Sequence, residues 1–350
     1  MNADILEAFD AVSIESPVRY SLHGQPRDLS SMQGGDPRAR MVQTLETDLY
    51  ARLYTRPSAA ADASNYLGQR DHVSALSAAN NGRGSWEPGW RIGEVDEEDG
   101  RVAVTKDAIT FWVDPATGIR TATGRARPGD WCRVLVAKEL RNLMPGFYFA
   151  IGDGDGADTR DRPEPLVRFY WNLTAAGAAP YMAAATQTLN AMAVPFRTKV
   201  LTDPASYVRS DGGVLYLERR FFHRVRAALL TIHAAVAAHL RPEVPMFTKA
   251  LAPGLGLAED PGGGMSFGQS RCRAIANGLW DAFASGAQGR ETRLQIVRDA
   301  LEAAGIDVDR PYLEKGSVDM YLLEAASRQE RRAAELELRR REKKERNAVR

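Results

Sequence analysis

Four cationic residues are placed along the chain in a way that predicts an anion-binding site. Arg168 lies in LVRFYWNL, Lys199 in VPFRTKVL, Arg209 just before GGVLYLER and Arg271 in MSFGQSRC. The first three segments are short, apolar and rich in β-branched or aromatic residues, which is typical of buried, neighbouring strands. Charged side chains are rarely buried without a partner, so cations that converge on one sheet require an anion between them. A phosphorylated ligand is the natural candidate, because arginine grips phosphate with two hydrogen bonds and lysine acts as a point charge.

The segments around these cations predict an α+β fold. Residues 1–85 are expected to be mostly helical, because DILEAFDAV and MVQTLETDLYARLYTR carry apolar residues at helical spacing. Short strands follow from about residue 90, beginning with a meander in WRIGEVDEEDGRVAVTKDAITFWVD, and helices dominate after GGVLYLER. Strands that meander and helices that group elsewhere favour a central, mostly antiparallel sheet flanked by helices.

We expect three regions along the chain. These are a helical N-terminal segment (1–85), an α+β domain (86–322) and a charged C-terminal helix (323–350) that begins near residue 318. Residues 326–350 hold ten Lys/Arg and five Asp/Glu, which is typical of a solvated helix, although contact with an acidic partner is an alternative. The Gly/Pro-rich stretch PMFTKALAPGLGLAEDPGGGMSFG is too long for an idle connector, so we predict a functional loop there.

The composition excludes several classes of protein. A net charge of +1 over 350 residues argues against a general nucleic-acid binder, and the apolar stretches are shorter than the ~20 residues that a bilayer requires. The N-terminal MNADILEAFDAV carries acids where a signal peptide carries basic residues. The only two cysteines stand outside metal or disulfide motifs, no HExxH is present, and GDGDGADTRD lacks EF-hand spacing. We therefore expect a cytoplasmic protein with no metal, no nucleic acid and no membrane among its partners.

A series of motifs, in order along the chain, resembles a known family. The motifs are PGFYFAIGD, RFYWNL, PFRTKVL, GGVLYL and APGLGLAEDP followed by SFGxxRC. They look like the HopA-type effector-like family, whose members occur among type III secretion effectors and in gene clusters for class V lanthipeptides and thioamitides. The likeness covers roughly residues 85–320. The same region is more distantly similar to phosphothreonine lyases and to the lyase domains of lanthipeptide synthetases, which remove phosphate from phosphoserine or phosphothreonine by β-elimination.

This resemblance implies roles for individual residues. The matching positions, in the order of the distant relatives' motif, are Arg168, Phe169, Tyr170, Lys199, Arg209, Tyr216 and Arg271. Lys199 is implied as the base, and the three arginines are implied as phosphate ligands. The general acid of those relatives is a histidine, whereas this chain has Tyr170 at that position. Either Tyr170 or another group protonates the leaving phosphate, or no acid is needed, or the protein only binds phosphopeptides.

The chemistry of the residues fits that implied reaction. An unperturbed lysine has a pKa of about 10.4, too high for an effective base near neutrality. Burial and nearby cations both disfavour the charged form, and Lys199 on a core strand among arginines meets both conditions. The arginines would stabilise charge on the departing phosphate, and Tyr216 or a backbone N–H could donate to the enolate-like oxygen. The reaction requires no metal and no organic cofactor.

Each candidate also has a purely structural interpretation. Lys199 could extend its amine to solvent at a strand end, and Arg209 could be solvated in its loop. Arg168 could pair with an acid of GDGDGADTRD, and Arg271 with Glu259 or Asp260. Tyr170 and Tyr216 could be core aromatic residues. Lys138, in AKELRNL, is a candidate for the substrate cleft, although a surface turn is the alternative interpretation.

The sequence therefore supports two main hypotheses. The first is a phosphoserine/phosphothreonine lyase that forms dehydroalanine or dehydrobutyrine in a ribosomally made precursor peptide. Because the chain has no GxxxxGK[ST] motif, this hypothesis implies a separate Ser/Thr kinase, alone or in complex with this protein, and a binding groove for the leader of the precursor. The second is a non-catalytic phosphopeptide-binding or effector-like interaction module. A cyclase that adds cysteine to dehydrated residues is a third alternative.

Overall fold

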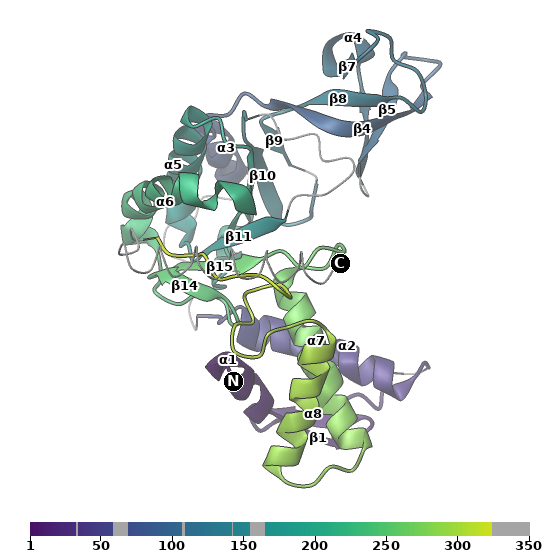
Figure 1. Cartoon of the computed structure of the whole chain (residues 1–350), viewed down its shortest axis with the longest axis vertical. Helices are drawn as coiled ribbons and strands as arrows, with labels where there is room; N and C mark the ends of the chain where they lie inside the picture. Colours follow the sequence, from purple (N-terminus) through teal and green to yellow (C-terminus); the bar gives the residue numbers. More distant parts are fainter. Residues whose placement is uncertain (33, 59–68, 107–108, 142, 155–164, 324–350) are drawn as a thin grey trace, which may run out of the picture.

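The predicted α+β class is confirmed. A computed structural model describes residues 1–32, 34–58, 69–106, 109–141, 143–154 and 165–323. Within these residues, α-helices combine with three sheets whose strand pairs are antiparallel (Figure 1). Among the described residues, no helix is both long enough and apolar enough to cross a bilayer. The proposed boundaries after residues 85 and 322 stay predictions.

The largest sheet has seven strands in the order β14-β15-β11-β13-β12-β10-β9. The strand β13 therefore lies between β11 and β12, so Arg168 and Lys199 are not on adjacent strands as the sequence suggested. The bounds of the strands are β9 (Glu139–Leu140), β10 (Phe147–Ile151), β11 (Leu166–Trp171), β12 (Phe196–Leu201), β13 (Gly213–Glu218), β14 (Lys249–Ala252) and β15 (Leu255–Glu259).

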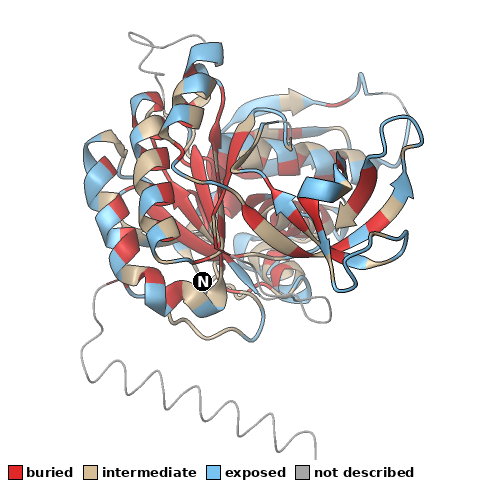
Figure 2. Cartoon of the chain, turned by 90° about the horizontal axis from the view of Figure 1, so that it is seen from above, coloured by how far each residue is buried: buried red, intermediate tan, exposed pale blue. Residues whose placement is uncertain are grey.

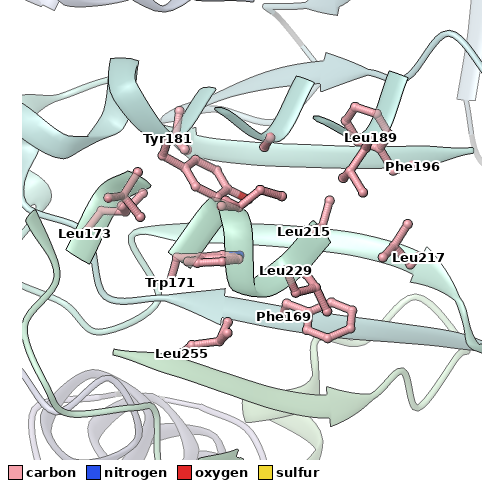
Figure 3. Close-up of a cluster of buried hydrophobic side chains, with 14 of the residues drawn as sticks. Phe169, Trp171, Leu173, Tyr181, Leu189, Phe196, Leu215, Leu217, Leu229 and Leu255 are labelled. Carbon is pink, nitrogen blue, oxygen red and sulfur yellow. The ribbon is translucent and has the colours of Figure 1, made fainter. Parts of the chain in front are cut away.

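One face of this sheet packs against helices and forms the first core. Phe169, Trp171 and Leu215 alternate along β11 and β13 and point to this face, where they are fully buried. Figure 3 shows them beneath the labelled Tyr181 and Leu229 of the covering helices. Burial of each such side chain contributes about 1.5–3 kcal/mol. The covering helices are α3 (Gln69–Ala79), α5 (Ala178–Ala191) and α6 (Phe222–Val236).

The second face of the sheet lies against the N-terminal segment and the later helices. Tyr170 of β11 is buried against Phe267 and shares a second core with Tyr54, so residues far apart in sequence meet over β11. The helices of this side are α1 (Ala3–Asp10), α2 (Pro37–Leu49), α7 (Phe267–Ala284) and α8 (Arg290–Ala303). A π-helix over Tyr50–Tyr54 continues α2 directly. Figure 2 shows buried positions on both sides of the central strands.

The prediction of a mostly helical N-terminal segment was wrong for residues 12–28. The helices α1 and α2 are present, but a three-stranded sheet separates them: β1 (Val12–Ser16), β2 (Arg19–Leu22) and β3 (Gln25–Asp28). His23 and Gly24 have φ of 49° and 72° and form a two-residue hairpin loop between β2 and β3. The strands β1 and β2 alternate apolar and polar residues over only five and four positions, and β3 has no large apolar residue, so the pattern is too short to stand out between two helical segments.

The predicted meander after residue 85 is confirmed as a five-stranded sheet in the order β6-β5-β4-β8-β7. One face carries the third core, which includes Trp90, Val104 and Val134. The strands are β4 (Ser85–Val95), β5 (Val102–Lys106), β6 (Ile109–Val113), β7 (Ile119–Thr121) and β8 (Trp131–Val136), with the single-turn α4 (Pro115–Gly118) before β7.

Two predictions for the C-terminal third need correction. The stretch expected to be a functional loop contains the hairpin β14–β15, whose turn includes Gly254 with φ of 70°. The last helix does not begin near residue 318, because residues 318–323 have no regular structure. Glu259 at the end of β15 fixes this segment, because its carboxylate accepts hydrogen bonds from the Tyr321 hydroxyl at 2.6 Å and from the Glu314 N–H at 2.8 Å. The rest of the predicted charged helix lies outside the described residues.

Candidate functional site

Lys199 and Arg168 lie on the same face of the large sheet, opposite the first core. Register places Arg168 opposite Tyr216 and Tyr216 opposite Arg197, while Lys199 lies opposite Val214 in the neighbouring row. Directly paired residues point to the same face, so four of the predicted site residues share one surface: Arg168, Tyr170, Lys199 and Tyr216. The sequence predicted this grouping correctly, although Tyr216 on β13 stands between the two cations.

The Lys199 amine lies among aromatic rings. Its Nζ is 4.0 Å from the centroid of Phe147 and 6.0 Å from that of Tyr216, and it contacts the Met144 sulfur at 3.4 Å. Among the described residues it forms no ion pair with a carboxylate. Burial lowers the pKa of Lys199 to about 8, the charges of Arg168 and Arg209 add to this effect, and Asp211 opposes it.

Arg168 has a carboxylate partner on the next strand of the sheet. Its Nε and Nη2 both lie 2.7 Å from Asp260 Oδ2, just beyond the end of β15. The guanidinium is also 5.4 Å from the centroid of the Tyr216 ring. Burial opposes the charge of Arg168, but Tyr170, Tyr216 and Asp260 outweigh burial and raise its pKa. One interpretation of the sequence placed the partner in GDGDGADTRD, most of which lies outside the described residues.

Arg209 is fixed by a residue of its own loop and by the N-terminal segment. Its Nη2 donates to Asp211 Oδ2 at 2.7 Å and to the Tyr50 hydroxyl at 3.1 Å, and its Nε also donates to Asp211. The Tyr50 hydroxyl lies 3.2 Å from the same Asp211 oxygen. The π-helix presents Tyr50 and Tyr54 toward the sheet with their rings stacked at 4.9 Å. Such π-turns inside helices frequently mark functional sites.

Three residues of this cluster were missed in the sequence. Asp260 is 92 positions from Arg168, and Tyr50 is 159 positions from Arg209, so no local pattern could reveal either pair. Asp211 is only two positions from Arg209, and this close spacing of opposite charges in a loop was the one available signal.

Tyr170 lies on the same face as Arg168 and Lys199, in the cross-strand row of Lys199, with Val214 of β13 between the two. It is 3% exposed, and its ring packs 6.3 Å from that of Phe267. Burial raises the pKa of Tyr170, while the neighbouring Arg168 charge and Tyr54 hydroxyl act in the opposite direction. Burial likewise raises the pKa of Tyr216, which is only half-buried. Both phenols therefore stay protonated at neutral pH.

Arg271 and Lys138 have partners of their own, although the Arg271 guanidinium lies 4.3 Å from the centroid of Phe267, the ring that packs on Tyr170. Arg271 is 1% exposed and donates to the Pro311 carbonyl at 3.0 Å and to Glu314 Oε1 at 2.7 Å, so it fastens the segment after α8. Its partner is thus Glu314 and neither Glu259 nor Asp260. Lys138 Nζ donates to the carbonyls of Ser77 and Asn80 at 3.1 and 3.0 Å, which caps the C-terminal end of α3.

The negative charge that we expected between the cations comes in large part from carboxylates of the protein itself. Each of the three arginines has its own carboxylate, and in the described part of the chain Lys199 and Lys138 are the predicted site cations without one. A cavity of about 470 Å³ adjoins the cluster on the same face and is lined by Arg197, Ile151 and Trp90, among others. Among the described residues, no three His, Cys, Asp or Glu side chains gather as a metal site would require.

Comparison with known proteins gives the relationship of the chain. Two solved structures are similar to it, both titled as an effector protein of Pseudomonas syringae, from pv. tomato strain DC3000 and pv. syringae strain 61. Each is 15% identical, covers 79% of this chain and 97% of its own, and superposes with TM-scores of 0.46 and 0.44 respectively. A search of curated protein sequences found no significant match. The profile described as the HopA1 effector protein family matches residues 139–313, half of the chain and the span that holds Arg168, Lys199, Arg209 and Tyr216, so the chain belongs to this family.

Proposed function

We propose that the protein is a phosphoserine/phosphothreonine lyase that acts on a phosphorylated precursor peptide. The observation that carries this proposal is the state of Lys199: an amine set among aromatic rings, with a pKa lowered to about 8 and two arginines nearby. In the proposed step, the neutral amine takes the Cα proton of the phosphorylated residue. The electron pair of the C–H bond forms the Cα–Cβ double bond, and the Cβ–O bond breaks to release phosphate. The product is dehydroalanine or dehydrobutyrine.

Arg168 and Arg209 are proposed to hold the phosphate in this reaction. Preformed cations stabilise the charge that moves to the leaving oxygens. Asp260 and Asp211 orient the two guanidinium groups through bonds to their Nε and Nη2 sides. Tyr216, whose ring lies within 6.0 Å of the Lys199 amine, is proposed to donate to the enolate-like oxygen.

Burial argues against Tyr170 as the group that protonates the leaving phosphate. Tyr170 is 3% exposed and neighbours Arg168, so its proposed contribution is to position that guanidinium and not to donate a proton directly. Phosphate monoesters have a second pKa of about 6 and are dianionic at neutral pH, so the two arginines are proposed to neutralise the charge that builds on the departing phosphate, and the released phosphate then takes up the proton that Lys199 removed from Cα. Arg271 and Lys138, which have structural partners, receive no role in phosphate binding.

The proposal implies partners. A precursor peptide with leader and core segments would be the substrate, and a separate Ser/Thr kinase, alone or in complex, would supply its phosphate. The cavity lined by Arg197 and Ile151 is a candidate for the segment of peptide that flanks the phosphorylated residue. The proposed mechanism uses no cofactor.

Mass spectrometry of a phosphothreonine peptide incubated with the protein tests the proposal. Loss of ~98 Da, the mass of phosphoric acid, is expected with the wild type and not with Lys199→Ala, because only the neutral amine removes the proton. Lys315→Ala, which changes an exposed lysine away from the cluster, is the matched control and should retain turnover. Turnover that survives Lys199→Ala would exclude this lysine as the base.

A phosphopeptide-binding module is the second candidate. It is favoured by the family relationship, which is to effector proteins, and by tyrosine in place of the acid of the distant lyase relatives. The two candidates differ in one experiment. If the protein is a binding module, the wild type binds the phosphothreonine peptide and the mass of the peptide does not change. If it is a lyase, the wild type releases the dehydrated product, and the Lys199→Ala variant binds the peptide without converting it.

A further inference from the structure

The five-stranded sheet presents a face that the proposed lyase site does not use. Side chains alternate along each strand, so residues that flank Trp90 and Val134 of the third core point to the other side. On that side lie three tryptophans and three arginines, which we call the Trp/Arg face. These residues are Trp86, Trp112, Trp131, Arg91, Arg120 and Arg133.

The register of the strands brings these residues onto one continuous surface. A bulge over residues 87–90 of β4 keeps the residues on either side of it pointing the same way. Residues directly opposite each other share a face, and the pairs on this face are Trp86 with Leu135, Arg91 with Trp131 and Arg120 with Arg133. Trp112 lies opposite Ala103, and Ala103 lies next to Gly93, so small residues border Trp112 on this face.

Two of the three arginines lie over indole rings. The Arg120 guanidinium carbon is 3.8 Å from the centroid of the Trp86 ring, and that of Arg91 is 4.6 Å from the Trp131 ring. Trp112 and Trp131 are nevertheless 44% and 43% exposed. Large apolar side chains gathered on an exposed face mark an interaction surface, and tryptophan and arginine are the residues most enriched at the energetic centres of interfaces.

We propose that the Trp/Arg face docks an extended peptide segment of a partner protein in which Asp or Glu alternate with apolar residues. Apart from Glu94 near the end of β4, the described strand positions of this face carry no acid and no lysine, so its three guanidinium groups give it a net positive charge, and Arg133 also donates to the Trp86 carbonyl at 2.8 Å. They lie on the adjacent strands β4, β8 and β7, about 5 Å apart per strand. Acids at alternate positions of an extended peptide are about 7 Å apart, so one peptide reaches at least two of them.

Other occupants fit this face less well. The C-terminal residues 326–350 of this chain have a net charge of +5 and would be repelled. Nucleic acid binding depends on many cations that contact phosphates, whereas here three guanidinium groups, two of them stacked on indoles, stand among apolar side chains. A second copy would offer the acidic residues 96–99 of its β4–β5 turn, and the test distinguishes this case.

Fluorescence anisotropy with a labelled synthetic peptide of alternating Glu and Leu or Phe tests the proposal on the full chain. Charge reversal by Arg91→Glu with Arg120→Glu should weaken binding by about tenfold or more, because it places like charges opposite the peptide acids. Trp112→Ser, which leaves the arginines in place, should also weaken binding. Arg70→Glu, an exposed arginine on α3, is the matched control and should bind as the wild type does. Circular dichroism and Tm of each variant establish that it is folded.

Three outcomes would overturn the proposal. The first is equal binding of a peptide with Lys in place of Glu. The second is displacement of the acidic peptide by oligouridylate at lower concentration than by the unlabelled peptide, which would assign the face to nucleic acid. The third is concentration-dependent dimerisation in sedimentation that the arginine reversal abolishes, which would assign the face to a second copy. Lys199→Ala should bind this peptide unchanged, so the result does not depend on the proposed lyase activity.

Discussion

The charged form of Lys199 destabilises the folded state, and this destabilisation is the physical basis of its proposed reactivity. Its folded pKa of about 8 is below the 10.5 of an unperturbed lysine, so the folded state disfavours protonation. The cost is present in full below pH 8 and disappears as pH rises toward 10.5. A residue whose local environment works against stability is typical of a functional site.

Substitution of this lysine by an apolar residue should therefore stabilise the protein. We expect Lys199→Met to raise the free energy of unfolding at pH 7 by about 1–2 kcal/mol, a value reduced for the partial exposure of the side chain. This gain in unfolding free energy should vanish above about pH 10.5, because the lysine then carries no proton in the unfolded chain either. Urea unfolding at pH 7 and pH 10.5 checks this, with Lys315→Met as the control. A destabilised variant at pH 7 would show that the amine makes favourable contacts instead.

The pH dependence of turnover follows from the same group. The neutral amine is the proposed base, so kcat/KM should rise with pH and level off with a midpoint near 8. An unperturbed lysine would place that midpoint above 10. Measurement of initial rates of dehydration from pH 6 to 10 gives the profile. A rate that falls over this range would indicate that the essential group acts in its protonated form.

The element that completes the cluster is the π-helix of the N-terminal segment, outside the span that matches the family. Its Tyr54 ring fills the space next to Gly268 in the first turn of α7. A Cβ at Gly268 would lie 2.4 Å from Tyr54 Cε1, and Tyr54 is buried among aromatic rings that leave it little room to move. Glycine at this position is thus required for the close approach of α7 and the π-helix.

We expect Gly268→Ala to destabilise the protein by about 1–3 kcal/mol, although alanine normally stabilises a helix relative to glycine. The cause is the overlap with the Tyr54 ring. In the background of Tyr54→Ala, which opens that space, most of the additional cost should be absent. Thermal unfolding of the four proteins of this cycle measures the coupling. Equal costs in both backgrounds would mean that the two residues do not interact.

Individual elements differ in how far the sequence determined them. The strands β10 to β13 were predictable because each is a short apolar run between turn signals, and the helices α5 to α8 because their apolar residues repeat at helical spacing. The hairpin β14–β15 was hidden by its glycines and prolines. For the site, period-two alternation places Arg168 and Tyr170 on one face, but the position of β13 between β11 and β12 depends on long-range pairing. The carboxylate partners depend on it too, which is why they were missed.

At the scale of the whole molecule, the two larger of the three sheets differ: the seven-stranded sheet is covered on both faces, whereas the five-stranded sheet has one exposed face. The central strands β11 and β13 are buried on both faces, whereas β5 and β6 pack on one face only. We expect amide hydrogens of β11 and β13 to exchange at least tenfold more slowly than those of β5 and β6, because local opening of the smaller sheet breaks fewer buried contacts. Hydrogen exchange with mass spectrometry checks this. Equal protection would indicate that both sheets open as one cooperative unit.

The pairing of Arg168 with Asp260 and of Arg209 with Asp211 has a consequence for the kinetics of ligand arrival. At a distance of one Debye length, about 8 Å at physiological ionic strength, each pair is nearly neutral, so the cluster exerts little long-range attraction. A phosphorylated ligand would then find it by diffusion and short-range exchange of ion partners, with an association rate that changes little with salt. Discrimination would occur at contact, where only a doubly charged oxyanion competes well with an aspartate already in place.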